Sequence, residues 1–300
     1  MSNSRERPET DYVAGTEVTP APSSGRNEWP SRWVPFGILA AYVLFRWSLA
    51  VIQLPDATPR WVLLVAAVLS AAGAIGLPIL GIVSLVRRPP SAVGALGLGA
   101  AGLAVWLGLA AARLSPGLAP LSGAVQDLGK ILAAAGVGVA LSAALREPNI
   151  LLPAGIFAAF ADFVVVNFGT VKHALSSPKG QAMVQAVSAQ VPAVHPRLAA
   201  LTIGPADFLF LGIFLACAAR FGMGVGRTAW ILAVVLALSL VLVPLIGPIP
   251  ALAPMATAFV VTNWRHFRLS RQELLSTLVV LVFMGGLFLT YFLFLFPKKR

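Results

Sequence analysis

The chain has 300 residues, of which 58% are hydrophobic and only 11% are charged, and its formal net charge is +11. A soluble domain of this length needs more charged residues to cover its surface, so the composition excludes an ordinary soluble protein and predicts an integral membrane protein. Most of the basic residues are scattered through short loops and the C-terminal tail. We therefore expect them to contact the lipid bilayer and set topology, with no nucleic-acid partner.

The predicted elements begin after residues 1–30, a polar stretch without periodicity that indicates a disordered tail. Nine apolar segments follow, and most are long enough to cross a hydrocarbon core, which takes about 20 residues. The eighth is short and begins with prolines, so it could be tilted or re-entrant. The segments are residues 34–54, 61–86, 92–112, 121–145, 150–169, 199–219, 228–246, 249–263 and 273–296. Such long continuous runs exclude barrel strands, so we predict an all-α polytopic transmembrane helical bundle of about nine membrane segments.

This order divides the chain into parts. After the tail, residues 31–148 hold four N-terminal transmembrane helices, residues 149–263 form a core, and residues 264–300 hold a last helix and a basic tail. The core contains the only long internal loop, residues 170–198. There the apolar residues Met183, Val184, Val187 and Val191 share one helical face, which predicts an interfacial helix.

Three of the eleven acidic residues, Asp127, Asp162 and Asp207, lie within apolar segments. An ionisable group at bilayer depth costs at least about 2.5–3.5 kcal/mol, so each is a functional candidate. Asp127 has Lys130 three residues later, a spacing that allows a helical ion pair. We interpret that pair as structural.

Asp162 and Asp207 have no Lys, Arg or His within a helical turn. They lie on consecutive antiparallel segments, one before and one after the long loop, and we expect both at roughly 10–12 Å below the same membrane face. Two facing carboxyl groups in a low-dielectric site share a proton and can activate water. A proton-coupled transporter or channel could use the same pair. The residues alone support water activation and proton-coupled transport about equally.

The surroundings of both aspartates carry a resemblance. The segment Leu201–Phe210 reads Leu-Thr-Ile-Gly-Pro-Ala-Asp-Phe-Leu-Phe, and Phe160–Val165 reads Phe-Ala-Asp-Phe-Val-Val. With the Pro-Ala-Leu tripeptide that begins at Pro250, these resemble the Gly-x-Gly-Asp, Tyr-Asp and Pro-Ala-Leu motifs of presenilins and signal peptide peptidases. The order of the motifs is also the family's, and the resemblance covers about residues 150–262.

The resemblance implies an intramembrane aspartyl protease that cleaves transmembrane segments of other membrane proteins, without a cofactor or a metal. The implied catalytic residues are Asp162 and Asp207, and the implied substrate-binding residues are Gly204, Pro250, Ala251 and Leu252. The sequence departs from the family at Ala206, which replaces the second glycine, and at Ala161, which replaces the tyrosine. Four spans rather than five precede the first aspartate, so a catalytically impaired presenilin-like scaffold is a third hypothesis.

Other catalytic classes have little support. His173, His195 and His266 lie in predicted loops and form no His-Glu-x-x-His pattern, so we interpret them as interfacial side chains and expect no zinc protease. The single cysteine, Cys217, lies in an apolar run and is predicted to be a buried packing residue. The composition, rich in Ala and Arg, favours a prokaryotic cell membrane.

Overall fold

The computed structural model describes residues 33–88, 90–112, 115–167, 177–198, 200–246, 250–268 and 270–290. The chain forms two units, Met1–Trp33 and Val34–Arg300. Only Trp33 of the first unit is among the described residues, so the predicted disordered tail lies outside them, as does the basic tail 298–300. The second unit contains all of the helices and strands discussed below.

Every predicted apolar segment contains a helix. The helices are α1 (Val34–Val51), α2 (Arg60–Val86), α3 (Ala92–Ala111), α4 (Ala119–Ser142), α5 (Leu151–Asn167), α8 (Pro205–Arg220), α9 (Val225–Ile246), α10 (Leu252–Thr262) and α11 (Arg271–Thr290). Three short 3₁₀ helices add η1 (Pro116–Leu118), η2 (Pro148–Ile150) and η3 (Trp264–His266). The helical bundle is thus confirmed.

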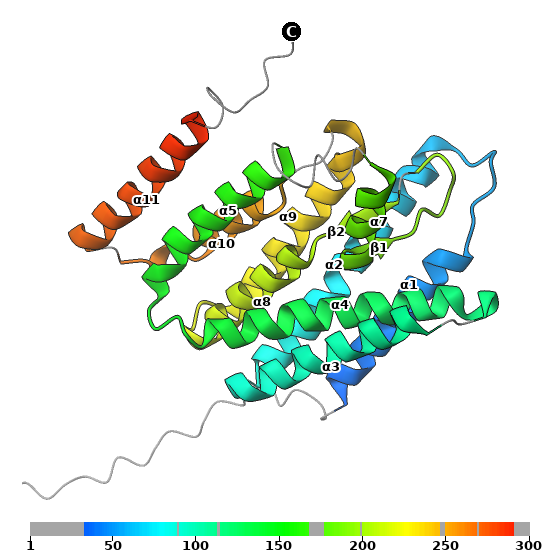
Figure 1. The fold of residues 1–300 in the computed structure, drawn as a ribbon, viewed down its shortest axis with the longest axis horizontal. Helices are drawn as coiled ribbons and strands as arrows, with labels where there is room; N and C mark the ends of the chain where they lie inside the picture. The colour runs from blue at the N-terminus through cyan, green and yellow to red at the C-terminus, as the bar shows by residue number, and fades with distance from the viewer. Residues whose placement is uncertain are drawn as a thin grey trace, which may run out of the picture. The chain divides into compact units, whose positions relative to one another are not determined.

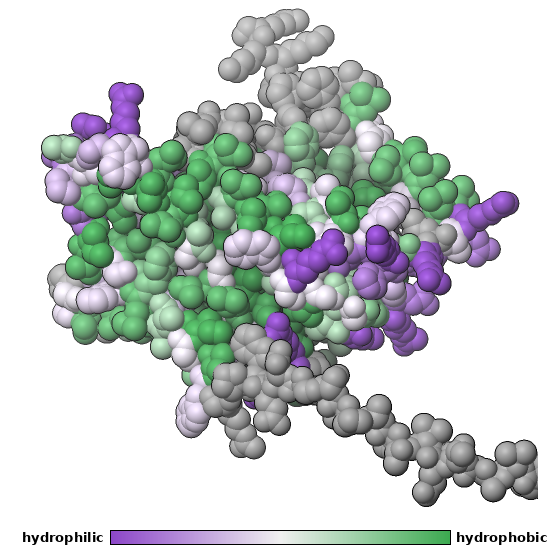
Figure 2. Space-filling model, turned by 180° about the vertical axis from the view of Figure 1, so that it is seen from behind, coloured by the Kyte–Doolittle hydropathy of each residue, from purple (hydrophilic) through white to green (hydrophobic). Residues whose placement is uncertain are grey.

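Six stretches of the described chain are long and apolar enough to cross a membrane, and they correspond to α1, α2, α3, α4, α5 with its preceding turn, and α9. Many of their large hydrophobic side chains are exposed, as are those of α11, where Leu278, Val282 and Phe283 are all more than half exposed. Figure 2 shows one face of the molecule covered mainly by hydrophobic residues, with hydrophilic residues gathered toward its two margins. An apolar outer surface of this extent indicates an integral membrane protein.

Glycines allow the central helix α4 to pack closely against its neighbours α3 and α8. A Cβ atom added to Gly102 of α3 would lie 2.7 Å from the backbone oxygen of Gly129 in α4. On the other side of α4, a Cβ atom on Gly138 would collide with the backbone oxygen of Leu209 in α8. Packing through small residues is how helices associate in lipid, where water exclusion contributes little.

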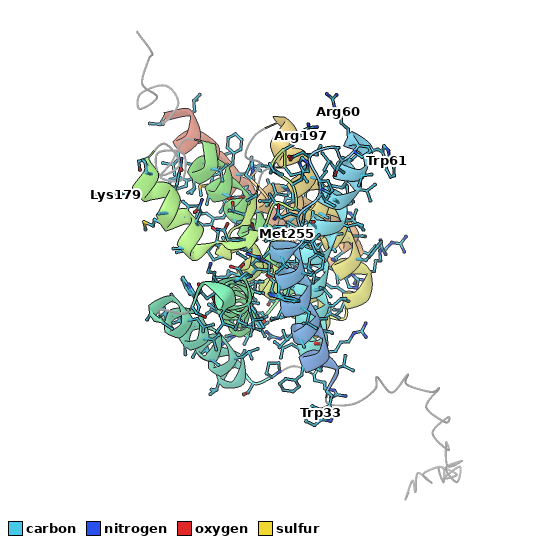
Figure 3. The ribbon with its side chains drawn as sticks, turned by 90° about the vertical axis from the view of Figure 1, so that its right-hand side faces the viewer. Trp33, Arg60, Trp61, Lys179, Arg197 and Met255 are labelled. Atoms are coloured by element: carbon cyan, nitrogen blue, oxygen red, sulfur yellow. The ribbon has the colours of Figure 1, made fainter. Side chains whose placement is uncertain are left out.

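The predicted loop contains a helix that is shorter than expected, and its interfacial location stays a prediction. It is α7 (Pro178–Val187), which begins after the N-cap Ser177, whose hydroxyl accepts from the backbone N–H of Gly180. Met183 is 71% exposed on it, and Lys179 points away from the helices in Figure 3. Val191, predicted on the same face, instead belongs to a strand.

That strand belongs to a small antiparallel ribbon that the sequence analysis did not predict. Strand β1 (Ala189–Val191) pairs with β2 (Leu201–Ile203), with Gln190 opposite Thr202. The predicted helix 199–219 was therefore wrong at its start, because α8 begins only at Pro205. Proline tolerates the first position of a helix, and the preceding residues form backbone bonds across the ribbon instead.

The C-terminal half is organised around the short helix α10, which packs against α5, α8 and α9. Figure 1 shows α10 (orange) between α5 (green) and α9 (yellow), with α11 (red) on the outer side of α5. Met255 and Phe259 of α10 are fully buried, and Met255 lies in the middle of the view in Figure 3. α10 therefore places its first residues beside the helices that carry Asp162 and Asp207.

Candidate functional site

Asp207 lies in the first turn of α8, directly after the ribbon. Strand β2 ends at Ile203, Gly204 is the N-cap of α8, and Pro205 is its first residue. The Oδ2 atom of Asp207 accepts a hydrogen bond of 3.1 Å from the backbone N–H of Gly204. A carboxylate in the first turn also interacts favourably with the positive end of the helix dipole.

Asp162 lies inside α5, and its partner comes from the Pro-Ala-Leu segment. The Oδ2 atom of Asp162 accepts a hydrogen bond of 2.9 Å from the backbone N–H of Leu252, which is the first residue of α10. The first N–H groups of a helix have no partner within that helix, so one of them is satisfied here by a carboxylate. The structure thus brings Asp162 and Leu252, 90 residues apart in the sequence, into direct contact.

Asp162 and Asp207 also lie near enough to each other for the charge of Asp162 to act on Asp207. Both side chains are partly buried. No salt bridge of either aspartate occurs in the part of the chain that the structure describes, where both ion pairs belong to Asp127. The site therefore consists of two neighbouring carboxyl groups, each held by the N–H group at the start of a helix.

Asp207 lies nearer the start of its helix than the apolar segment 199–219 predicted, and its depth below the membrane face stays a prediction. It follows the first residue of α8 by two positions, or about 3 Å of helix rise, and Asp162 lies five positions before Asn167, the last described residue of α5. The difference arises because the ribbon delays the start of α8. The two residues nevertheless come together, since α10 bridges α5 and α8.

The helix face of Asp162 packs on α10. A Cβ atom on Gly155 would lie 3.4 Å from the Cβ of Ala256 in α10, and Ala158 is buried within the core. The small face of α5 therefore accommodates α10, and this contact orients the Pro-Ala-Leu segment toward Asp162.

The remaining predicted site residues surround these two carboxyl groups. Gly204 has φ −68° and ψ 152°, a conformation open to any residue, and an added Cβ atom would lie 3.4 Å from Oδ2 of Asp207, an ordinary contact. Folding therefore does not require glycine there. Ala206, the departure from the family motif, is exposed, and Pro250 and Ala251 are partly buried.

Two backbone groups of the Pro-Ala-Leu segment are bonded within the protein. The N–H of Leu252 donates to Asp162, and the carbonyl of Ala251 accepts from the N–H of Met255.

Sequence reasoning missed one member of the Asp127 cluster. The predicted pair with Lys130 is present, with Nζ 3.1 Å from Oδ1 of Asp127. Arg46 in the middle of α1 completes it, because its Nε and Nη2 atoms both lie 3.0 Å from Oδ2 of Asp127. An arginine inside an apolar segment was the available signal, since such a residue normally has a buried partner.

His195 also differs from its prediction as an interfacial side chain. It is 1% exposed, and its Nδ1 atom accepts from the backbone N–H of Arg197 at 3.0 Å. In the described part of the chain, Nε2 of His195 is the only buried side-chain polar atom without a hydrogen-bond partner. His173 lies outside the described residues. Cys217 is buried as predicted.

No protein-family model, no curated protein and no solved structure matches this chain.

Proposed function

We propose that the protein is an intramembrane aspartyl protease that cleaves transmembrane segments of other membrane proteins. Its Asp162 and Asp207 side chains together activate the attacking water. The observation that carries this proposal is the neighbouring pair of carboxyl groups, which forms no ion pair among the described residues, with the N–H of Leu252 in the Pro-Ala-Leu segment bound to Asp162. Two such groups share one proton, because both cannot easily be ionised side by side.

The pair supports a general acid–base mechanism. The ionised carboxylate takes a proton from water while the oxygen of that water bonds to the carbonyl carbon of the substrate. The protonated carboxyl group donates a hydrogen bond to the carbonyl oxygen. When the tetrahedral intermediate collapses, the carbon–nitrogen bond breaks and the proton passes to the leaving amine, so that the pair returns to its starting state.

A helical substrate has to unwind before its peptide bond is accessible, because its backbone groups are bonded to one another. The ribbon supports this step. Strand β2 ends at Ile203, beside Gly204 and one turn before Asp207, and a two-stranded ribbon has outer edges to which an extended peptide can add. Gly204 then leaves room for the substrate backbone beside Asp207, a role that its unstrained conformation does not otherwise explain.

The test is cleavage of a panel of single-span substrates by purified protein in liposomes, compared with Asp162→Asn and Asp207→Asn. We expect each substitution to lower the rate at least about a hundredfold, the usual contribution of a general acid or base. The matched control is Asp56→Asn, since Asp56 is exposed in a turn, and it should cleave like the original protein.

Cleavage that survives either substitution at the pair would contradict the proposal. Proton or solute flux that depends on both aspartates, with no cleavage of any substrate, would support the transporter hypothesis in its place. An intact fold with neither activity would support the scaffold hypothesis.

A further inference from the structure

A second buried polar cluster joins α1 and α4 to the residue before β1. It consists of Arg46, Asp127 and Lys130, which are 7%, 2% and 7% exposed. Besides its bond to Asp127, Lys130 donates from Nζ to the backbone oxygen of Ser188 at 2.8 Å. Figure 1 shows β1 beside α4. The cluster therefore connects two candidate spans to the ribbon.

The charges of this cluster do not balance. Arg46 and Lys130 contribute two positive charges, and Asp127 contributes one negative charge. Burying a charge without a counter-charge costs several kcal/mol even after relaxation. Asp127 is the only acidic residue among the described residues that line the adjoining cavity. The cluster thus holds one positive charge for which the described lining offers no partner.

The adjoining cavity has a volume of about 360 Å³, within the usual range for small-ligand sites. The cluster lines it together with three amide side chains, Gln126, Gln185 and Gln190. No nitrogen of Arg46 or Lys130 is both buried and unpartnered in the described structure. The donors that do not bind Asp127 or Ser188 therefore keep access to the cavity, where an anion can accept from them.

We propose that this cavity binds a phosphate group, with Arg46 and Lys130 as its cationic partners. A guanidinium group donates two parallel hydrogen bonds to phosphate oxygens, and an ammonium group adds a point charge. The amide side chains supply further donors. The phosphate can belong to an anionic phospholipid or to a free small anion. Because basic pockets between transmembrane helices accept lipid headgroups and α1, α3 and α4 are candidate spans, we expect the lipid.

Native mass spectrometry of the full chain in neutral detergent tests the lipid source, with phosphatidylglycerol compared with zwitterionic phosphatidylcholine. Calorimetric titration with inorganic phosphate tests the free anion. We expect preferential retention of phosphatidylglycerol, and Arg46→Gln should weaken it at least about tenfold, the value of one charge-assisted hydrogen bond. Arg46→Gln leaves Asp127 paired with Lys130, so the remaining cluster is neutral and we expect the variant to fold.

The matched control is Arg60→Gln, the same change of charge at an exposed residue that does not line the cavity and that extends away from the helices in Figure 3. It should retain the lipid like the original protein. Should Arg46→Gln fail to fold, Gln185→Leu takes its place, because Gln185 is exposed and outside the ion pairs, and it should lower retention severalfold.

Each outcome decides the proposal. Binding of inorganic phosphate that depends on Arg46, without a preference for phosphatidylglycerol, supports the site and assigns it a free anion. No preference and no phosphate binding overturn the proposal. Retention unchanged in both Arg46→Gln and Gln185→Leu also overturns it, since the lipid then binds elsewhere.

Discussion

The two acidic clusters in apolar helices bind their carboxylates to different kinds of partner. Asp127 is neutralised by two cations, Arg46 and Lys130, at 3.0 and 3.1 Å. Asp162 and Asp207 are instead held by backbone N–H groups at the starts of α10 and α8. Two cations beside Asp127 suit a fixed structural or anion-binding role. The proposed general acid–base chemistry instead needs acids that exchange a proton, and no ion pair of Asp162 or Asp207 occurs among the described residues.

The largest expected effect on stability is the loss of the carboxylate in the Asp127 cluster. Asp127→Asn leaves two buried cations without a carboxylate and should lower the free energy of unfolding by about 3–5 kcal/mol. Asp207→Asn should lower it by less than about 1 kcal/mol, because the amide oxygen can still accept from Gly204. Denaturant titration in mixed micelles measures both. Equal losses would remove the distinction between the clusters.

A smaller effect tests how far the clusters are mechanically linked, because α4 carries Asp127 and packs against α8. Gly138→Ala places a methyl group against the backbone oxygen of Leu209 and should cost about 1–3 kcal/mol of stability. It should also lower cleavage, since α8 carries Asp207. The control is Gly97→Ala, at an exposed position with nothing within 4 Å of the added Cβ. Stability is measured by thermal unfolding, and an equal response of the two variants would contradict the packing argument.

The next comparison separates folding from function at the aspartate pair. Gly204→Ala should change stability by no more than about 0.5 kcal/mol, because its backbone conformation and space accept a methyl group. Cleavage should fall about tenfold or more, since misplacing a substrate by a fraction of an ångström is costly. Unfolding and single-turnover cleavage are measured on the same preparation. Unchanged cleavage would show that the substrate does not approach Gly204.

A last, small effect on stability concerns the contacts of Asn149 near the surface. Asn149 donates to Glu273 at 2.9 Å and exchanges two hydrogen bonds with the backbone of Arg268, which joins the start of α5 to the loop before α11. Because Asn149 and Glu273 are only partly buried, Asn149→Ala should cost only about 0.5–1 kcal/mol. Thermal unfolding measures it. A loss as large as that of Asp127→Asn would mean that burial does not set the difference between the clusters.

Much of the fold was predictable from the sequence. Long apolar runs gave the positions of the helices, because in lipid every backbone group has to be bonded within its own segment. The ribbon was not predicted, since three-residue strands leave almost no periodic pattern and the surrounding apolar residues suit a helix equally well. That ribbon is why α8 starts six residues later than expected.

The candidate site was predictable in its residues but not in its contacts. The sequence by itself determined that Asp162 and Asp207 are acids in apolar helices without a neighbouring cation, since adjacency along a helix can be counted. It likewise determined the Asp127–Lys130 pair. Its presenilin-like motifs are the basis of a proposal. Membrane segments beyond the six candidates also stay a prediction.

Only the tertiary structure decided which groups those acids bind. The partners of Asp162 and Asp127, Leu252 and Arg46, lie 90 and 81 residues away from them. Such contacts depend on which helices pack side by side, and small residues such as Gly138 and Gly155 set that packing. The sequence therefore placed the charges along the helices, and the packing of α10 and α1 determined which acid binds a backbone N–H group and which binds a second cation.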